Sequence, residues 1–330
     1  MRFTCFLYHL KNFSLLFLCL LSSHSFADQP SPFLTRDNSP FSLIFGLPLA
    51  SSAKLLETDQ SRWTSSFNIS NTINLQSNTN ENLFVDVETW NVNFLYDYGL
   101  KENWMLRVQL PYLIHSGGFL DSAIEKYHST LGLPEDIRPN FPRDQIDISL
   151  NQNGQNFIDT NSQQSALGDI SVQMAWQAQQ SKLYALSYWM SLKLPSGDAK
   201  KITGSGAFDI ATWAAMNYRL TDTRWFYGQG GLLYMSDSDL FENIQKNFAV
   251  FGNAGLKFQP WDSIILKAQF DFHSAFYDSN LEFLGDVLQL TFGGGYLISH
   301  QHRLDFSIVE DIKNGASPDV NFNISWWIYL

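Results

Sequence analysis

Apolar and polar residues alternate one by one along most of this chain, in segments of about ten to thirteen residues. Residues 264–273 show the pattern clearly, with Ile264, Leu266, Ala268, Phe270 and Phe272 alternating with Lys267, Gln269, Asp271 and His273. Successive side chains point to opposite faces in a β-strand, whereas the side chains of a helix repeat every 3.6 residues. The alternation therefore predicts an all-β protein.

An alternating strand fits a soluble β-sandwich or a membrane β-barrel, which differ in the direction of the apolar face. Here the polar faces carry charged residues and the apolar faces have aromatic residues near their ends, in a chain with 15% aromatic and 16% charged residues. Membrane barrels turn an apolar band with aromatic girdles toward lipid and keep a polar interior. The pattern favours the barrel, with the sandwich as the alternative.

Twelve strands can be placed along the chain, near residues 62–76, 83–97, 103–115, 167–179, 183–194, 207–219, 224–235, 247–258, 263–274, 285–298, 302–310 and 318–330. Turns of a few residues alternate with longer loops, and the longest loop runs from Ser116 to Ala166. An even number of strands with this alternation is typical of bacterial outer-membrane barrels. We predict a transmembrane up-and-down antiparallel β-barrel of about twelve strands over residues 62–330, in the outer membrane of a Gram-negative bacterium.

The last strand has a further property of outer-membrane barrels. Val320, Phe322, Ile324, Trp326, Ile328 and Leu330 alternate with more polar residues up to the last position. This pattern resembles the terminal strand by which the barrel-insertion machinery recognises its clients. We therefore expect that machinery as a partner, together with outer-membrane lipid and lipopolysaccharide.

The first 27 residues resemble a secretory signal peptide. Arg2 and Lys11 precede the apolar run at residues 13–21. Ser25 and Ala27 are the small residues that a signal peptidase requires before its cleavage site. Both cysteines lie in this leader, so a mature chain from Asp28 has no disulfide. Residues 28–61 carry turn signals, and we expect a periplasmic N-terminal segment that partly enters the lumen.

Several segments resemble an uncharacterised proteobacterial family, domain of unknown function 3187. The most specific are HSGGFLD (115–121) and HSTLGLPEDIR (128–138), accompanied by NSPF (38–41), DVET (86–89), LKLPSGD (192–198), TGSGAFD (203–209) and SPD (317–319). The resemblance covers essentially the whole mature chain. It implies an outer-membrane barrel and brings no agreed activity.

The long third loop is a candidate constriction of the pore. Gly117 and Gly118 end a strand, and Asp121 can cap a short helix over residues 122–131. This helix either folds over the pore mouth or packs on the barrel rim. The residues expected near the mouth are His115, Gly117, Gly118, Asp121, Glu125 and His128.

Two chemical functions are conceivable for the same loop and its surroundings. His115 and His128, with Asp121 and Glu125, could hold zinc, but their spacing matches no ligand motif, so we expect neither metal nor cofactor. A lipid hydrolase would pair serine with histidine, yet the histidine–serine pairs here are adjacent in sequence and face opposite sides of a strand. We predict no enzymatic activity, with the hydrolase as an alternative.

The leading hypothesis is a passive channel or binding conduit for a small solute. Its selectivity would come from the charged lumen residues Arg107, Lys193, Lys267, Asp271 and Arg303. The alternative is a structural barrel plugged by residues 28–61. Nucleic acid is not expected as a partner, because the leader holds two of the 21 Lys and Arg residues and none of the 32 Asp and Glu residues, which leaves an acidic mature chain.

Overall fold

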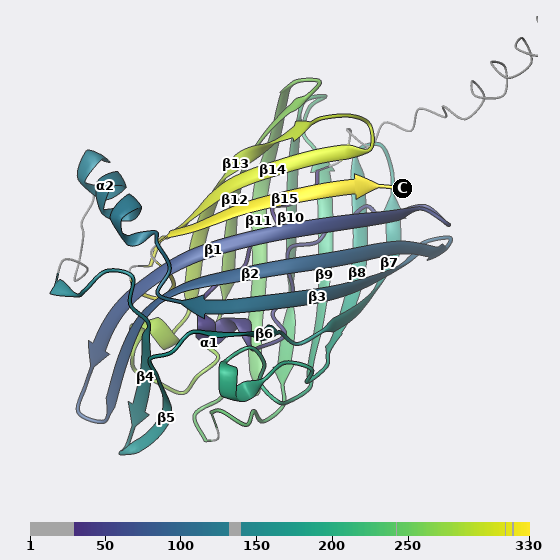
Figure 1. Cartoon of the computed structure of the whole chain (residues 1–330). Coiled ribbons are helices and arrows are strands. Elements are labelled where there is room, and N and C mark those ends of the chain that lie inside the picture. Colours follow the sequence, from purple (N-terminus) through teal and green to yellow (C-terminus); the bar gives the residue numbers. More distant parts are fainter. Residues whose placement is uncertain (1–29, 132–139, 242, 314, 319) are drawn as a thin grey trace, which may run out of the picture.

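The computed structural model describes residues 30–131, 140–241, 243–313, 315–318 and 320–330. The predicted signal peptide and part of the third loop therefore lie outside the described residues. Within them the chain forms one large antiparallel sheet that closes on itself as a barrel (Figure 1).

Twelve strands make up the closed barrel, which confirms the prediction. They are β1 (Ser61–Ser77), β2 (Glu81–Lys101), β3 (Trp104–Ser116), β7 (Ser171–Gln180), β8 (Tyr184–Lys193), β9 (Asp209–Arg219), β10 (Arg224–Met235), β11 (Phe248–Trp261), β12 (Ile264–His273), β13 (Val287–Leu297), β14 (His302–Asp311) and β15 (Val320–Tyr329). The first and last strands close the barrel, pairing from Arg62↔Tyr329 to Asn71↔Val320. Closure leaves no unpaired edge, as a sheet in a membrane requires.

Three short strands extend the sheet at one end. β4 (Asp147–Gln152) pairs with the first residues of β2, β5 (Gln155–Thr160) pairs with β4, and β6 (Gln164–Leu167) pairs with the last residues of β3. We call this end the long-loop end, and the opposite end, where the connections are brief, the short-turn end. A membrane strand needs roughly 9–11 residues, so the 21-residue β2 extends well beyond a bilayer.

Helices are few. α1 (Pro40–Leu43) lies inside the barrel and α2 (Asp121–Leu131) lies in the long third loop (Figure 1). Two 3-10 turns, η3 (Ala199–Lys201) and η4 (Glu282–Leu284), belong to other connections at the long-loop end. α2 confirms the predicted loop helix. No helix in the described parts of the chain is long and apolar enough to cross a membrane.

The apolar faces of the strands point outward, as predicted for a barrel. On β12, Leu266 and Phe270 are 46% and 49% exposed, whereas Gln269 between them is completely buried. Large exposed apolar side chains recur on the other barrel strands, including Trp63, Phe94, Met190, Leu232, Phe306 and Trp326. This outward direction excludes the sandwich, in which the apolar faces would meet in a shared core.

Candidate functional site

The bore of the barrel is occupied by the chain's own N-terminal segment. Residues 30–60, which we call the plug, enter at the short-turn end, turn through α1 near the long-loop end and return to β1 (Figure 1). Residues 31–35, 37–45 and 47–51 are buried. The segment expected as a periplasmic stretch that partly enters the lumen is therefore found inside the barrel.

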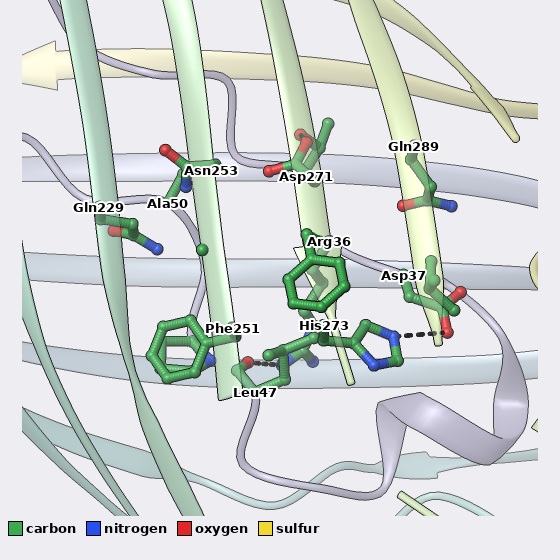
Figure 2. Close-up of a pocket in the computed structure, with 15 residues that line it drawn as sticks. Arg36, Asp37, Leu47, Ala50, Gln229, Phe251, Asn253, Asp271, His273 and Gln289 are labelled. Atoms are coloured by element: carbon green, nitrogen blue, oxygen red, sulfur yellow. Dashed lines mark hydrogen bonds and ion pairs between the residues drawn. The ribbon is translucent and has the colours of Figure 1, made fainter. Parts of the chain in front are cut away.

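The ascending part of the plug runs in fixed register with β12. Lys267 Nζ donates to Ser31 O (3.1 Å), Phe33 N to Gln269 Oε1 (3.0 Å), and Thr35 Oγ1 to Asp271 Oδ2 (2.9 Å). Asp37 Oδ2 lies 3.4 Å from His273 Nε2 (Figure 2). The two residues of each pair are 236 positions apart in the sequence. The separation is constant because the extended plug segment runs beside β12, and every second plug residue meets the next inward-facing residue of the strand.

The descending part of the plug is held by side chains of β7, β9 and β10. Gly46 N donates to Asp209 Oδ2 (2.7 Å), Ser51 N to Gln229 Oε1 (2.8 Å) and Leu55 N to Gln177 Oε1 (2.9 Å). Buried backbone groups need such partners when they have no strand beside them. The plug is thus bound through wall side chains rather than as a thirteenth strand.

An apolar cluster closes the bore at the long-loop end. Ser39 caps α1 by accepting from Phe41 N (3.3 Å), and Pro40 occupies the first helical turn. The Phe41 ring lies against Phe241, Tyr277 and Phe283, at centroid distances of 5.8, 6.4 and 5.9 Å. Ile148 and Leu150 of β4 are also buried in this cluster.

Tyr277 ties this cluster to the plug by a hydrogen bond. Its hydroxyl donates to Phe41 O (2.7 Å). Burial raises the pKa of Tyr277 well above its usual value, so the hydroxyl remains a donor throughout the physiological range.

Three ionic clusters line the inward wall. They contain four of the five predicted lumen residues, and Asp271 lies outside them. Asp97 accepts from Arg62 Nε (2.9 Å) and Arg107 Nε (2.6 Å), and Asp305 accepts from Lys267 Nζ and Arg303 Nη2 (3.0 Å each). Lys193 Nζ lies 2.7 Å from Asp169 Oδ2 and 3.1 Å from Asp209 Oδ2. All five predicted residues are buried on the inward face. Four of them also contact the plug: Lys193 through Ile44, Lys267 and Arg303 through Ser31, and Asp271 through Thr35.

Glu88 holds the start of the third loop. Its completely buried carboxylate accepts from Phe119 N (3.1 Å), Leu120 N (3.0 Å) and the Trp90 indole (2.7 Å). Gly118 crosses this carboxylate with φ +69°, and a Cβ there would lie 2.2 Å from Glu88 Cδ. The glycine is thus required both by its backbone conformation and by the close approach.

The structure separates the residues predicted to form a loop constriction. His115 is buried on β3, between Thr89 Oγ1 and Ile202 O, both at 3.1 Å. Asp121 binds Asn71 Nδ2 and Asp144 N, and Glu125 binds Arg143. α2 projects away from the barrel beyond the wall of β1 (Figure 1), and the side chain of His128 lies outside the described residues. Among the described residues the plug fills the bore, α2 lies outside it, and the third loop contributes Ile148 and Leu150 of β4 to the apolar cluster at the long-loop end.

Five of the segments that carry the family resemblance lie around the plug and the start of the third loop, whereas residues 132–138 of HSTLGLPEDIR lie outside the described residues. Asn38 of NSPF donates to Ser70 Oγ (2.8 Å) and accepts from Asn91 (3.1 Å), while Lys193 of LKLPSGD donates to Ile44 O (3.0 Å) and to Ser205 of TGSGAFD. Glu88 of DVET binds the HSGGFLD segment. These motifs are therefore the anchoring points of the plug and the loop.

The sequence matches the model of a protein family described as protein of unknown function (DUF3187), over residues 11–327. The chain belongs to this family. No curated protein matches it. Among solved structures, the COG4313 outer membrane channel from Pseudomonas putida F1 is similar with a TM-score of 0.58 and 11% identity, over 84% of this chain and 98% of that one.

Two other solved structures share the barrel more distantly. The Ralstonia pickettii toluene transporter TbuX has a TM-score of 0.44 and 9% identity, over 91% of this chain and 96% of that one. The KdgM porin has a TM-score of 0.43 and 6% identity, over 80% and 98%. At these identities the likeness concerns the fold, which is that of outer-membrane barrels.

One cavity adjoins the plug, and another lies at the short-turn end. A small void of about 20 Å³, the size of a single water site, lies between the plug and β10–β13, beside Asp37, Gln229, Asp271 and Gln289 (Figure 2). A cavity of about 640 Å³ lies at the short-turn end, beside the turns around Asp222, Trp261 and His300. Among the described residues, no group of three or more His, Cys, Asp and Glu side chains is arranged to hold a metal ion.

The fit of Gly118 over Glu88 leads to a stability prediction. Gly118→Ala should lower the free energy of unfolding by about 1–3 kcal/mol, because the added methyl combines an unfavourable backbone conformation with a clash. Gly154→Ala is the matched control, since Gly154 also has a positive φ (+80°) but has no atom within 4 Å of the added Cβ. Urea titration of the refolded protein measures both variants. Equal losses would show that contact with Glu88 is unimportant.

Proposed function

We propose that this protein is an outer-membrane conduit for a small solute, closed at rest by the plug and opened when the plug moves. The supporting observation is how the plug is held: its backbone binds wall side chains through separate hydrogen bonds, such as those from Phe33 N, Ser51 N and Leu55 N. Each such hydrogen bond contributes a net stabilisation of only about 0.5–1.5 kcal/mol. The barrel closes through β1 and β15, so the plug can move without opening the wall.

In this proposal the short-turn end faces the periplasm, as in bacterial barrels with short periplasmic turns. The outward apolar belt contacts outer-membrane lipid, the long-loop end meets lipopolysaccharide, and β15 is recognised by the barrel-insertion machinery. The fold similarity to an outer membrane channel supports a role in transport rather than catalysis. The charged wall residues Arg107, Lys193, Lys267, Asp271 and Arg303 would select the solute once the plug has moved.

A reversible lock on the plug tests the proposal. The Thr35 and Thr291 hydroxyl oxygens lie 3.4 Å apart, between plug and wall, so cysteines there can approach bonding distance. The predicted mature chain has no other cysteine. In planar bilayers, the oxidised Thr35→Cys/Thr291→Cys variant should show at least tenfold fewer openings than the same protein after reduction.

The single variant Thr35→Cys is the matched control, and its conductance should not respond to reductant. Equal conductance of the oxidised and reduced double variant would contradict a moving plug. Silence of both forms and of the unmodified protein, in a correctly folded barrel, would contradict the conduit. It would favour the closed structural barrel that the apolar cluster around Phe41 suggests.

A further inference from the structure

The cavity of about 640 Å³ at the short-turn end is lined by apolar and aromatic side chains together with polar and charged ones. We call it the vestibule. Its lining includes Trp261, Ile265, Leu297, His300, Arg303 and Tyr329. Its volume is that of sites for small organic molecules, which are mostly apolar with a few directed polar groups. The vestibule has this composition without any movement of the plug.

The wall beneath the vestibule carries an excess of positive charge. Arg303 lines the vestibule, and Lys267 lies behind it on the inward face of β12. These two buried cations share one buried carboxylate, Asp305. Buried charges act through a lower effective dielectric than charges in water. The excess of positive charge therefore favours an anion in the vestibule.

The carboxylates that border the vestibule do not cancel this excess. Asp222 and Asp262 stand at the tips of turns, and both are exposed. Asp222 also pairs with Arg219 at 3.2 Å. Exposed charges are screened by water and salt. An anion that enters past this rim meets mainly the cationic wall.

Arg303 connects the vestibule to the plug. Its guanidinium stacks on the Trp327 ring (4.4 Å to the centroid), donates through Nη2 to Asp305, and donates through Nη1 to Ser31 Oγ (2.5 Å). Gly295 leaves the space for Asp305, because a Cβ there would lie 2.3 Å from Asp305 Oδ1. A guanidinium carries five N–H donors. Arg303 can therefore hold Asp305 and still donate to an oxyanion on the vestibule side, in competition with Ser31.

We propose that the vestibule binds an amphiphilic organic anion, with its apolar body against Trp261, Ile265 and Leu297 and its carboxylate at Arg303. The proposal names the class of solute that the conduit would carry. Binding at the vestibule does not depend on the proposed function, whereas passage of the ligand through the barrel does. Binding at the vestibule weakens the contact of Arg303 with Ser31, where the plug begins. The ligand would thereby loosen the plug that it has to pass.

Three probes that share a naphthalene ring and differ in charge test the site. 2-Naphthoate, 2-naphthamide and 2-naphthylmethylammonium are titrated calorimetrically into the full-length, detergent-solubilised barrel. Naphthoate should bind at least tenfold more tightly than the other two. Arg303→Gln should remove this preference, Arg303→Lys should keep part of it, and Trp261→Ala should weaken naphthoate and naphthamide alike.

Arg224→Gln is the matched control, because Arg224 is an exposed arginine that stacks on Phe258 and does not line the vestibule. Heat-modifiable migration verifies the fold of each variant. Equal affinity for the three probes, or an anion preference unchanged in Arg303→Gln, would overturn the inference. Naphthoate binding by a barrel that never conducts would refute the conduit and leave the binding site standing.

Discussion

Asp97→Ala is expected to lower the free energy of unfolding by about 3–5 kcal/mol. Asp97 is 1% exposed and is the shared partner of Arg62 and Arg107. Without it, two guanidinium groups remain buried on β1 and β3, which flank β2, with no carboxylate between them. Each arginine also stacks on an aromatic ring, Arg62 on Trp327 of β15 and Arg107 on Trp189 of β8, and this stacking holds each guanidinium in its buried place.

Urea titration of protein refolded in detergent micelles, followed by heat-modifiable migration, measures this loss. Asp222→Ala is the control, since its side chain is 97% exposed and pairs only at the surface with Arg219. It should change stability by less than about 0.5 kcal/mol. A loss for Asp97→Ala as small as that of the control would show that the two arginines are already hydrated.

Lys193→Met is expected to destabilise the barrel by a similar amount, about 3–5 kcal/mol, and to release the descending part of the plug. Lys193 separates Asp169 from Asp209 and donates to Ile44 O in the plug, while Asp209 accepts from Gly46 N. Methionine retains much of the length of lysine but removes its charge. The two carboxylates would then face each other, and the turn after α1 would lose its ionic anchor.

Two readouts are expected to change together in Lys193→Met. The urea midpoint should fall, and openings in planar bilayers should become more frequent than in the unmodified protein. Lys182→Met is the control, because Lys182 is exposed in the turn between β7 and β8. Adding Asp209→Asn to Lys193→Met should recover part of the lost stability, because one of the two opposed charges is removed. Full additivity of the two substitutions would contradict the coupling.

The twelve strands could be predicted from the sequence because their signal is local. On β12, alternate side chains lie on opposite faces of the sheet, so that Leu266 and Phe270 face outward while Lys267 and Asp271 face the interior. The short turns and the long loops were visible for the same reason. The loop helix was also predictable, since Asp121, the periodic apolar residues and the following glycine and proline lie within one short stretch.

The content of the bore was predicted only in part: residues 28–61 were expected to enter the lumen partly, and a plug formed by them was one alternative. The sequence suggested a constriction from the third loop, but the structure has α2 outside and the plug inside. One signal was available: the N-terminal segment carries Phe33, Leu34, Phe41, Ile44 and Phe45 without strand alternation, and such residues need cover. The sequence does not say which surface covers them.

The sequence by itself thus determined the barrel, its outward apolar face and the inward placement of Arg107, Lys193, Lys267, Asp271 and Arg303. Only the tertiary structure decided that these residues bind one another and the plug, and that a vestibule remains open beside Arg303. The physical reason is separation along the chain. Alternation is set by neighbouring residues, whereas the contacts of Ser31, Phe33 and Thr35 with β12 join residues about 236 positions apart, and no local pattern encodes them.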